Sequence, residues 1–323
     1  MRRPKFLSPT ALDLYSKNPR EYYLSYLADV KPPRIPQTPP MAVGSSFDAF
    51  IKNHLHKSVF GTNDPQFEID TIFEKQVEPH NRDDAKKAGM YLFLEYKKSG
   101  AIADLLLDLT QSITPPRFEF DIHKEIGGVP FMGKPDLGFT HKDGCEIVLD
   151  WKVNGYYSNS APSPAPGFLR LRTGTSLLPG HKSVIEMRHK GIRINVATTL
   201  DRVKPDWANQ LSIYAWCLGA GVGTDFITAI DQIVCKKISD GSFPSVRFAE
   251  HRLKIDPNFQ KNLLTKAQTA WATINSDHYF RDVTKEESQK QTEMLDAVAE
   301  SLCGPKSAAD KWFDESTRDR NPY

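Results

Sequence analysis

Residues 128–153 read GVPFMGKPDLGFTHKDGCEIVLDWKV. Two short apolar-rich runs, 129–140 and 146–153, stand on either side of a His-Lys-Asp-Gly segment of strong turn composition. Apolar runs separated by such a turn are typical of a β-hairpin. We therefore expect an antiparallel strand pair here and place the other elements of the protein around it.

The register of this hairpin gathers three charged side chains. If the loop is centred on Asp143, the numbers of paired residues sum to 286, and Asp136 lies opposite Asp150. Lys152 lies two residues beyond Asp150 and therefore on the same face of the strand. Like charges opposite each other destabilise a sheet unless something compensates them. A divalent cation held by both carboxylates would compensate them.

The other face of the hairpin is apolar, and we expect it to be buried. Its side chains are Ile147, Leu149, Trp151 and Val153 on the second strand, with Leu137 and Phe139 across from them.

The remaining pattern predicts an α+β protein (α/β sandwich), in which helices flank a central mixed, largely antiparallel β-sheet. Ser8 is the expected cap of the first helix, with Pro9 at its first position. A strand in 117–126 leads into the hairpin, so that three antiparallel strands precede Asn154. The other expected helices are 20–30, 41–55, 67–103, 206–218, 258–274 and 285–299, and the other expected strands are an antiparallel pair, 226–238 and 245–255.

The composition is that of an ordinary globular protein. Among the 323 residues, 42 basic and 40 acidic side chains give a formal net charge of +2. Global charge therefore argues neither for nor against a nucleic-acid partner, which would have to meet a local patch. No apolar run is long enough to span a membrane and the first residues lack the apolar centre of a signal peptide, so we expect a cytoplasmic protein without membrane contact. Widely spaced cysteines without a CxxC pair indicate neither a zinc site nor disulfides.

Residues 155–205 are rich in Pro, Ser, Gly and basic side chains, and we expect a long irregular insertion. Basic residues mixed with aromatic ones suit a surface that follows a nucleic-acid backbone. A solvated insertion without such a role remains the alternative. The candidate nucleic-acid-binding residues are Tyr156, Arg170, Arg172, Lys182, Arg188, Lys190 and Arg193.

Asp136, Asp150 and Lys152 are the groups that metal-assisted hydrolysis of a phosphodiester requires. Carboxylates suit Mg²⁺ or Mn²⁺, which prefer oxygen ligands. A lysine can orient the attacking water or stabilise charge on the phosphate. Asp48, on the expected helix 41–55, is the candidate for a third acidic ligand, and a surface acid is the alternative reading of this residue.

These residues resemble a known family. Pro135-Asp136 followed by Asp150-Trp151-Lys152 is similar to the signature of the PD-(D/E)XK nucleases. Residues 210–214 match the Q-x-x-x-Y motif of the RecB-type branch, and residues 44–48 match its G-x-x-x-H motif, with aspartate in place of histidine. Residues 12–27 resemble its Cys-Pro-Arg-x-Tyr-Tyr segment, with asparagine in place of cysteine.

The resemblance implies a restriction-endonuclease-like core and a stand-alone DNA nuclease, similar to phage-type exonucleases of recombination or repair. It implies Asp48, Asp136, Asp150 and the backbone carbonyl of Trp151 as metal ligands, and Lys152 as a catalytic residue. It also implies that Gln210 and Tyr214 position the phosphate or the scissile strand, although they could be a helix-packing pair, and Lys152 could simply pair with Asp150 or Asp136. Because Asn18 replaces the cysteine, no iron-sulfur cluster is expected.

The expected partner is DNA, and a single-strand annealing protein or a separate helicase is a further candidate. Any motor that moves along DNA must be another chain, because no GxxxxGK[ST] motif occurs here. The sequence leaves oligomer formation open. We expect one nuclease domain in 1–283, with a helical cover in about 1–110, a catalytic core in about 115–255 and the insertion in about 155–205. A C-terminal helix and polar tail follow in 284–323.

Two other functions remain open at this point. One is a catalytically silent module that binds nucleic acid or a partner on the same scaffold, against which the retention of Asp136, Asp150 and Lys152 argues. The other is a metal-dependent phosphohydrolase that acts on nucleotides, and the basic insertion favours a polymer substrate instead.

Overall fold

We analysed a computed structural model of the chain. It describes residues 3–32, 36–62, 64–155, 162–237 and 244–276, together with the short pieces 289–290, 292–294 and 296–297.

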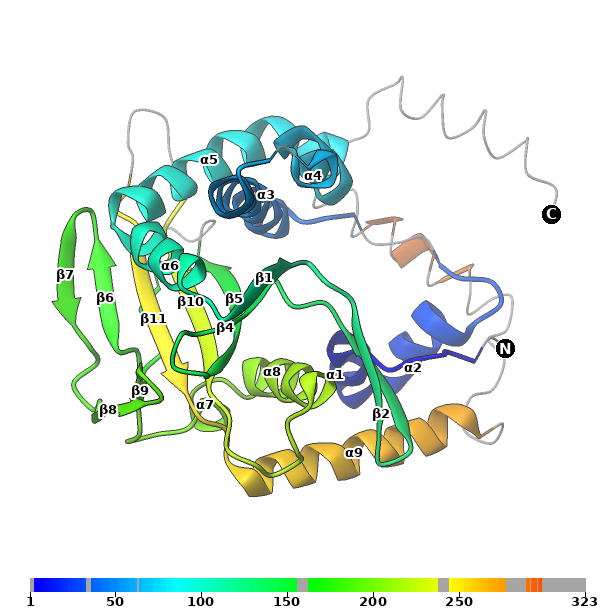
Figure 1. The fold of residues 1–323 in the computed structure, drawn as a ribbon. Helices are drawn as coiled ribbons and strands as arrows, with labels where there is room; N and C mark the ends of the chain where they lie inside the picture. Colours follow the sequence, from blue (N-terminus) through cyan, green and yellow to red (C-terminus); the bar gives the residue numbers. More distant parts are fainter. Residues whose placement is uncertain are drawn as a thin grey trace.

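A mixed β-sheet forms the centre of the described part of the chain (Figure 1). Neighbouring strands are antiparallel, except that β5 pairs with β10 in parallel and β9 meets β11 in parallel. The strands, in spatial order, are β1 (Thr114–Phe118), β4 (Leu137–Thr140), β5 (Glu146–Asn154), β10 (Thr228–Val234), β11 (Arg247–Leu253), β6 (Arg170–Thr173) and β7 (Ser176–Pro179), with the hairpin of β8 (Glu186–His189) and β9 (Ile192–Asn195) joined to β11.

The predicted register of the hairpin is confirmed. Leu137 pairs with Leu149, and Phe139 pairs with Ile147. β4 begins one residue after Asp136, so Asp136 stands just outside the ladder, next to Asp150. The two acids therefore lie just before the first residue of β4, where the pairing of β5 with β4 stops.

The prediction of one continuous strand over 129–140 is wrong. Its first half, β3 (Val129–Gly133), pairs with β2 (Ile122–Ile126) in a separate two-stranded sheet. Between β3 and β4 stands Pro135, which has no N–H to donate to a ladder. The expected strand over 117–126 is likewise broken, because Glu119 has a positive φ of 45° and the chain turns there.

The expected helices form in the described residues with adjusted ends, except that the expected helical region 67–103 is divided into three α-helices. Ser8 caps the first helix, because its Oγ accepts a hydrogen bond from the backbone N–H of Ala11 at 3.2 Å. The expected helix 20–30 consists of a short helix and one π-helical turn. The helices are α1 (Pro9–Lys17), α2 (Pro19–Tyr22), the π-turn Tyr23–Leu27, α3 (Pro39–Phe60), α4 (Ile69–Gln76), α5 (Arg82–Lys98), α6 (Ala101–Thr110), α7 (Leu200–Val203), α8 (Pro205–Leu218) and α9 (Pro257–Asn275).

Helices cover the sheet on both faces (Figure 1). α3, α5 and α6 bury the apolar face of β5, including Leu149 and Trp151, in one core cluster. α8 covers the other face, where Trp207, Leu211 and Tyr214 pack with Ile230 of β10. Burial of this apolar area supplies the main favourable term for folding. Lys152 on the polar face of β5 meets Gln210 of α8, and Asp136 just before β4 meets Lys52 of α3.

Two other expectations concern the chain beyond the catalytic hairpin. The expectation of an irregular insertion is wrong for residues 170–195, because β6 to β9 form two hairpins there and extend the sheet. The predicted helix 285–299 falls mostly outside the described residues, although the described pieces of it are helical. Among the described residues, no helix combines the length and the apolar character needed to cross a lipid bilayer.

Candidate active site

Three carboxylates from three different elements meet beside α3. Asp48 lies in the middle of α3, Glu119 follows β1, and Asp136 precedes β4. One carboxylate oxygen from each lies within 4.8 Å of the corresponding oxygens of the other two. The chain reversal at residue 119 carries Glu119 back towards the hairpin, where its backbone N–H donates to the carbonyl of Asp136 at 3.1 Å.

A lysine from α3 stands among these acids. Lys52 follows Asp48 by four residues, so the two side chains share one face of the helix. The Nζ of Lys52 contacts Asp48, lies 2.5 Å from Oε1 of Glu119 and lies 3.1 Å from Oδ1 of Asp136. Lys134 reaches the other oxygen of Glu119 from the solvent side at 2.8 Å. Two ammonium groups thus face three carboxylates.

The second half of the site lies on β5 and α8. Lys152 pairs with Asp150 and donates a hydrogen bond to Oε1 of Gln210 at 2.9 Å. The amide nitrogen of Gln210 donates to the Tyr214 hydroxyl at 3.0 Å. That hydroxyl in turn donates to the carbonyl of Lys134 at 3.4 Å. The Q-x-x-x-Y spacing therefore places both side chains on the face of α8 that meets the hairpin.

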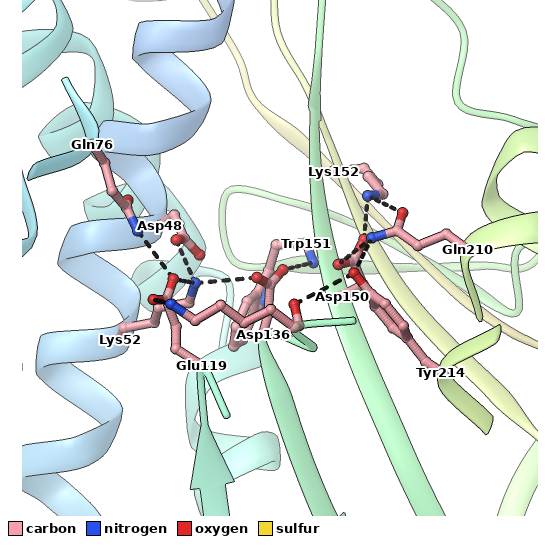
Figure 2. A network of polar contacts seen from close by, with 11 residues as sticks. Asp48, Lys52, Gln76, Glu119, Asp136, Asp150, Trp151, Lys152, Gln210 and Tyr214 are labelled. Carbon is pink, nitrogen blue, oxygen red and sulfur yellow. Dashed lines mark hydrogen bonds and ion pairs between the residues drawn. The ribbon is translucent and has the colours of Figure 1, made fainter. Parts of the chain in front are cut away.

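Asp136 joins the two halves (Figure 2). Its Oδ2 accepts a hydrogen bond at 3.2 Å from the backbone N–H of Trp151, the residue between Asp150 and Lys152. Because the N–H and C=O groups of one strand residue point to the same side, the carbonyl of Trp151 also faces Asp136. This position is compatible with the carbonyl ligand that the sequence suggested.

Burial and neighbouring charges shift the acidities of the site. Burial, reinforced by Asp136, raises the pKa of Asp150 to about 7. Burial also raises the pKa of Asp48 to about 7 against the opposing effect of Lys52. At Asp136 burial acts in the same direction and is the largest single cause, but Lys52, Asp150 and Lys152 together outweigh it and the net shift of the pKa is downward. Asp150 and Asp48 therefore take up protons near neutral pH, whereas Asp136 stays ionised there.

The donor set fits a hard divalent cation. All three groups of the cluster are carboxylates, the ligand type preferred by Mg²⁺ and Mn²⁺. Their side chains are partly open to solvent, with exposed fractions of 18% for Asp48, 23% for Glu119 and 22% for Asp136. A cation can therefore enter without unfolding of the protein. Asp150 is not part of this three-carboxylate group and lies on the far side of Asp136 (Figure 2).

Sequence reasoning missed Glu119 and Lys52. Two signals were available: Lys52 stands one helical turn after Asp48, and Glu119 alternates with Phe118 and Phe120, which places it on the polar side of its strand. The expected unbroken strand over 117–126, however, gave no reason to bring Glu119 to the hairpin. Gln76, at the end of α4, also reaches the site by donating to Glu119 at 3.0 Å.

The candidate nucleic-acid-binding residues have different surroundings. Arg170 pairs with Glu250 at 2.7 Å, and Arg172 pairs with Asp104 and donates to the carbonyl of Ser99 at 3.0 Å. These two arginines tie the sheet to α5 and α6 and border a charged cavity of about 190 Å³. Those on the surface of the β8–β9 region are Lys182, Arg188, Lys190 and Arg193, and Tyr156 lies outside the described residues.

A comparison with known protein families gives a match over the part of the chain that contains the hairpin. The family model of the PD-(D/E)XK nuclease superfamily matches residues 6–167, half of the 323 residues. This range contains Asp48, Asp136 and Lys152. None of the curated proteins matches the chain.

Two solved structures are similar to the chain at low identity. A protein from Eubacterium rectale, provisionally named an exonuclease, has 12% identity and a TM-score of 0.43 over 87% of this chain and 90% of its own. The protein SSO0001 has 13% identity and a TM-score of 0.25 over 80% of this chain and 84% of its own. Both likenesses are too distant to support an argument about function.

Proposed function

The chain belongs to the PD-(D/E)XK nuclease superfamily, and on this premise we propose that it is a divalent-metal-dependent deoxyribonuclease that hydrolyses phosphodiester bonds as an exonuclease. The observation that carries the proposal is the continuous network in which Asp136 links Asp48 and Glu119 to Asp150 and Lys152. The proposed cation is Mg²⁺ or Mn²⁺, and the proposed role is in recombination, repair or phage DNA metabolism.

In this proposal the acids form the metal site. Asp136 is the proposed central ligand, Asp48 and Glu119 hold the cation with it from the α3 side, and Asp150 and the Trp151 carbonyl are the proposed ligands on the β5 side of Asp136. When bound, a divalent cation acidifies a water molecule and neutralises charge on the phosphate. Proton release from Asp150 and Asp48, whose pKa values lie at about 7, accompanies this binding.

The other side chains act on the substrate. Lys152 carries its positive charge at the edge of the acidic network, where it can orient the attacking water or stabilise the negative charge of the phosphate. Gln210 fixes the ammonium of Lys152 at 2.9 Å. The Tyr214 hydroxyl, one helical turn away, completes the polar wall against which the scissile phosphate is positioned. Positioning of this kind lowers the activation free energy by preventing unproductive orientations.

The exposed cations of the β8–β9 hairpin are the proposed contact with the DNA backbone. Arg188, Lys190 and Arg193 are exposed and lie on a hairpin that extends from the sheet (Figure 1). Arg170 and Arg172 contribute less in this proposal, because Glu250 and Asp104 already compensate their charges. Contacts to phosphates would make DNA binding strongly dependent on salt.

The test uses end-labelled linear DNA and covalently closed circular DNA, each with Mg²⁺, Mn²⁺ or EDTA. We expect metal-dependent cleavage of the linear DNA, and loss of this cleavage in Asp150→Asn and Lys152→Ala proteins that still melt cooperatively. A matched control is the surface pair Asp225 and Lys254, whose Nζ to Oδ2 distance is 2.6 Å. Asp225→Asn and Lys254→Ala should cleave as the wild type does.

Each possible result decides between functions. Cleavage of the closed circle would replace the exonuclease proposal by an endonuclease. DNA binding without cleavage under every metal condition would favour the catalytically silent binding module. Full activity in either Asp150→Asn or Lys152→Ala would refute the assignment of the active site.

A further inference from the structure

Lys52 is the most deeply buried charged side chain of the acidic site. Its side chain is 1% exposed, although it ends among three carboxylates that are each partly open to solvent. Burial of an ammonium is costly unless it is paired and hydrogen-bonded. Here Asp136, Asp48 and Glu119 more than offset that cost, and the pKa of Lys52 is raised.

The position of its nitrogen is the position that a metal ion would take. Nζ lies 2.5 Å from Oε1 of Glu119 and 3.1 Å from Oδ1 of Asp136, and it contacts Asp48. The same three residues form the cluster whose ligand atoms lie within 4.8 Å of one another. A cation such as Mg²⁺ binds carboxylate oxygen at about 2.1 Å, so an ion bound to all three would overlap the ammonium group.

We propose that Lys52 is a built-in cation of the acidic site, which occupies the three-carboxylate position in the metal-free protein and leaves it when a divalent cation enters. This inference rests on the proposed function, since it presupposes a metal at these carboxylates. In this inference, Lys52 controls whether a metal ion occupies the three carboxylates. The roles of Lys152 and the Q-x-x-x-Y residues do not depend on it.

The surroundings of Lys52 favour displacement over permanent exclusion of the metal. Asp48 is one helical turn away on α3, so a small rotation of the long lysine stem keeps that ion pair while Nζ leaves Asp136. Glu119 does not depend on Lys52 for its position, because Lys134 and Gln76 hold it at 2.8 Å and 3.0 Å. The three carboxylates can therefore stay in place while the cation among them is exchanged.

The experiment compares Lys52→Met, which removes the charge and keeps the length of the side chain, with wild type. Lys254→Met is the matched control, because it removes the charge of a lysine that pairs with Asp225 outside the acidic site. Binding of Mn²⁺ is measured by calorimetry and by electron paramagnetic resonance without DNA. Thermal melting is measured in EDTA and with Mg²⁺.

We expect Lys52→Met to bind Mn²⁺ about tenfold more tightly than wild type or to bind one additional ion, since a positive charge in contact with the ligands is gone. The variant should melt at a lower temperature than wild type in EDTA, and Mg²⁺ should raise its melting temperature by more than that of wild type. Lys254→Met should stay within about threefold of the wild-type affinity.

Unchanged Mn²⁺ affinity and stoichiometry in Lys52→Met, or weaker binding, would overturn the inference. If Lys52→Met does not fold, Asp48→Asn with Lys52→Met is compared with Asp48→Asn alone, and the same increase in affinity is expected from loss of the lysine. These readouts need no DNA cleavage. An inactive wild type that still shows the difference in metal binding would refute the nuclease proposal and leave the role of Lys52 standing.

Discussion

The backbone N–H of Trp151 donates a hydrogen bond to Oδ2 of Asp136, with a distance of 3.2 Å between nitrogen and oxygen. Asp136 lies just before β4, whereas Trp151 lies in β5 between Asp150 and Lys152. This bond lies just beyond the last backbone-paired residues of the two strands. It extends their pairing through a side chain instead of the backbone. It fixes the acid of one strand against the acid and the lysine of the other.

Replacement of Gln210 should separate catalysis from folding. Gln210→Ala removes the hydrogen bond to Lys152 and the bond to Tyr214. We expect kcat for DNA cleavage to fall roughly tenfold to a hundredfold, because the ammonium loses its fixed orientation. Steady-state cleavage of linear DNA measures the change, and Asn209→Ala on the preceding helix position is the control. A helix-packing role alone would instead lower the melting temperature and leave kcat unchanged.

Gly133 makes room for the ring of Tyr214. A Cβ at this position would lie 2.6 Å from Cδ1 of Tyr214 and closer still to Cε1. Gly133→Ala should therefore push the ring away from Gln210 and lower cleavage to about the level of Tyr214→Ala. A double-mutant cycle is the measurement. In a Tyr214→Ala protein, Gly133→Ala has no tyrosine ring to displace, so the two effects should be far from additive. Additive losses would contradict this explanation.

The pH dependence of stability should reveal the buried acid Asp150. Burial and the neighbouring Asp136 raise its pKa from 3.8 to about 7 in the folded protein. Between these two values the folded state keeps a proton that the unfolded state has lost, so stability falls as the pH rises through this window. In EDTA, Asp150→Asn should be more stable than wild type at about pH 8, and the difference should fade towards about pH 4. Urea unfolding across this pH range measures the free energy of unfolding of both proteins. Parallel curves of this free energy against pH would contradict the prediction.

His251 should contribute a loss of stability in acid. Burial lowers its pKa from 6.5 to about 3, and its Nε2 donates to Oε1 of Gln232 at 3.2 Å. The neutral ring stabilises the fold fully above pH 6.5. This contribution is lost as the pH falls towards 3, by at most about 1.4 kcal/mol per pH unit.

His251→Phe keeps an aromatic ring between Phe168 and Trp207. It should be less stable than wild type at neutral pH by about 1 kcal/mol, because one buried hydrogen bond is lost. Its stability should decline less steeply below pH 6.5. Urea unfolding at several pH values measures both effects, and an unchanged acid slope would show that His251 is not the titrating group.

The sequence by itself determined the local features of this protein. Alternation and turn composition fixed the β4–β5 register, because a shift by one residue would expose Leu149 and bury Lys152. Capping residues and apolar spacing located the helices, including α8 with Gln210 and Tyr214 on one face. The motif spacing identified Asp136, Asp150 and Lys152 as candidate site residues, and the structure brings them into one network.

Which residues come together at the hairpin depends on the tertiary structure. The break between β3 and β4 has a local cause in Pro135, but the chain reversal at Glu119 depends on packing against α3, where Lys52 meets Glu119, which no short-range pattern encodes. For that reason the sequence did not reveal Glu119 as a member of the cluster, nor the parallel pairing of β5 with β10. Lys52 belongs to the same category. Its sequence position gives a helical ion pair with Asp48, but its place among three carboxylates exists only because α3, the turn at residue 119 and the start of β4 meet at one point.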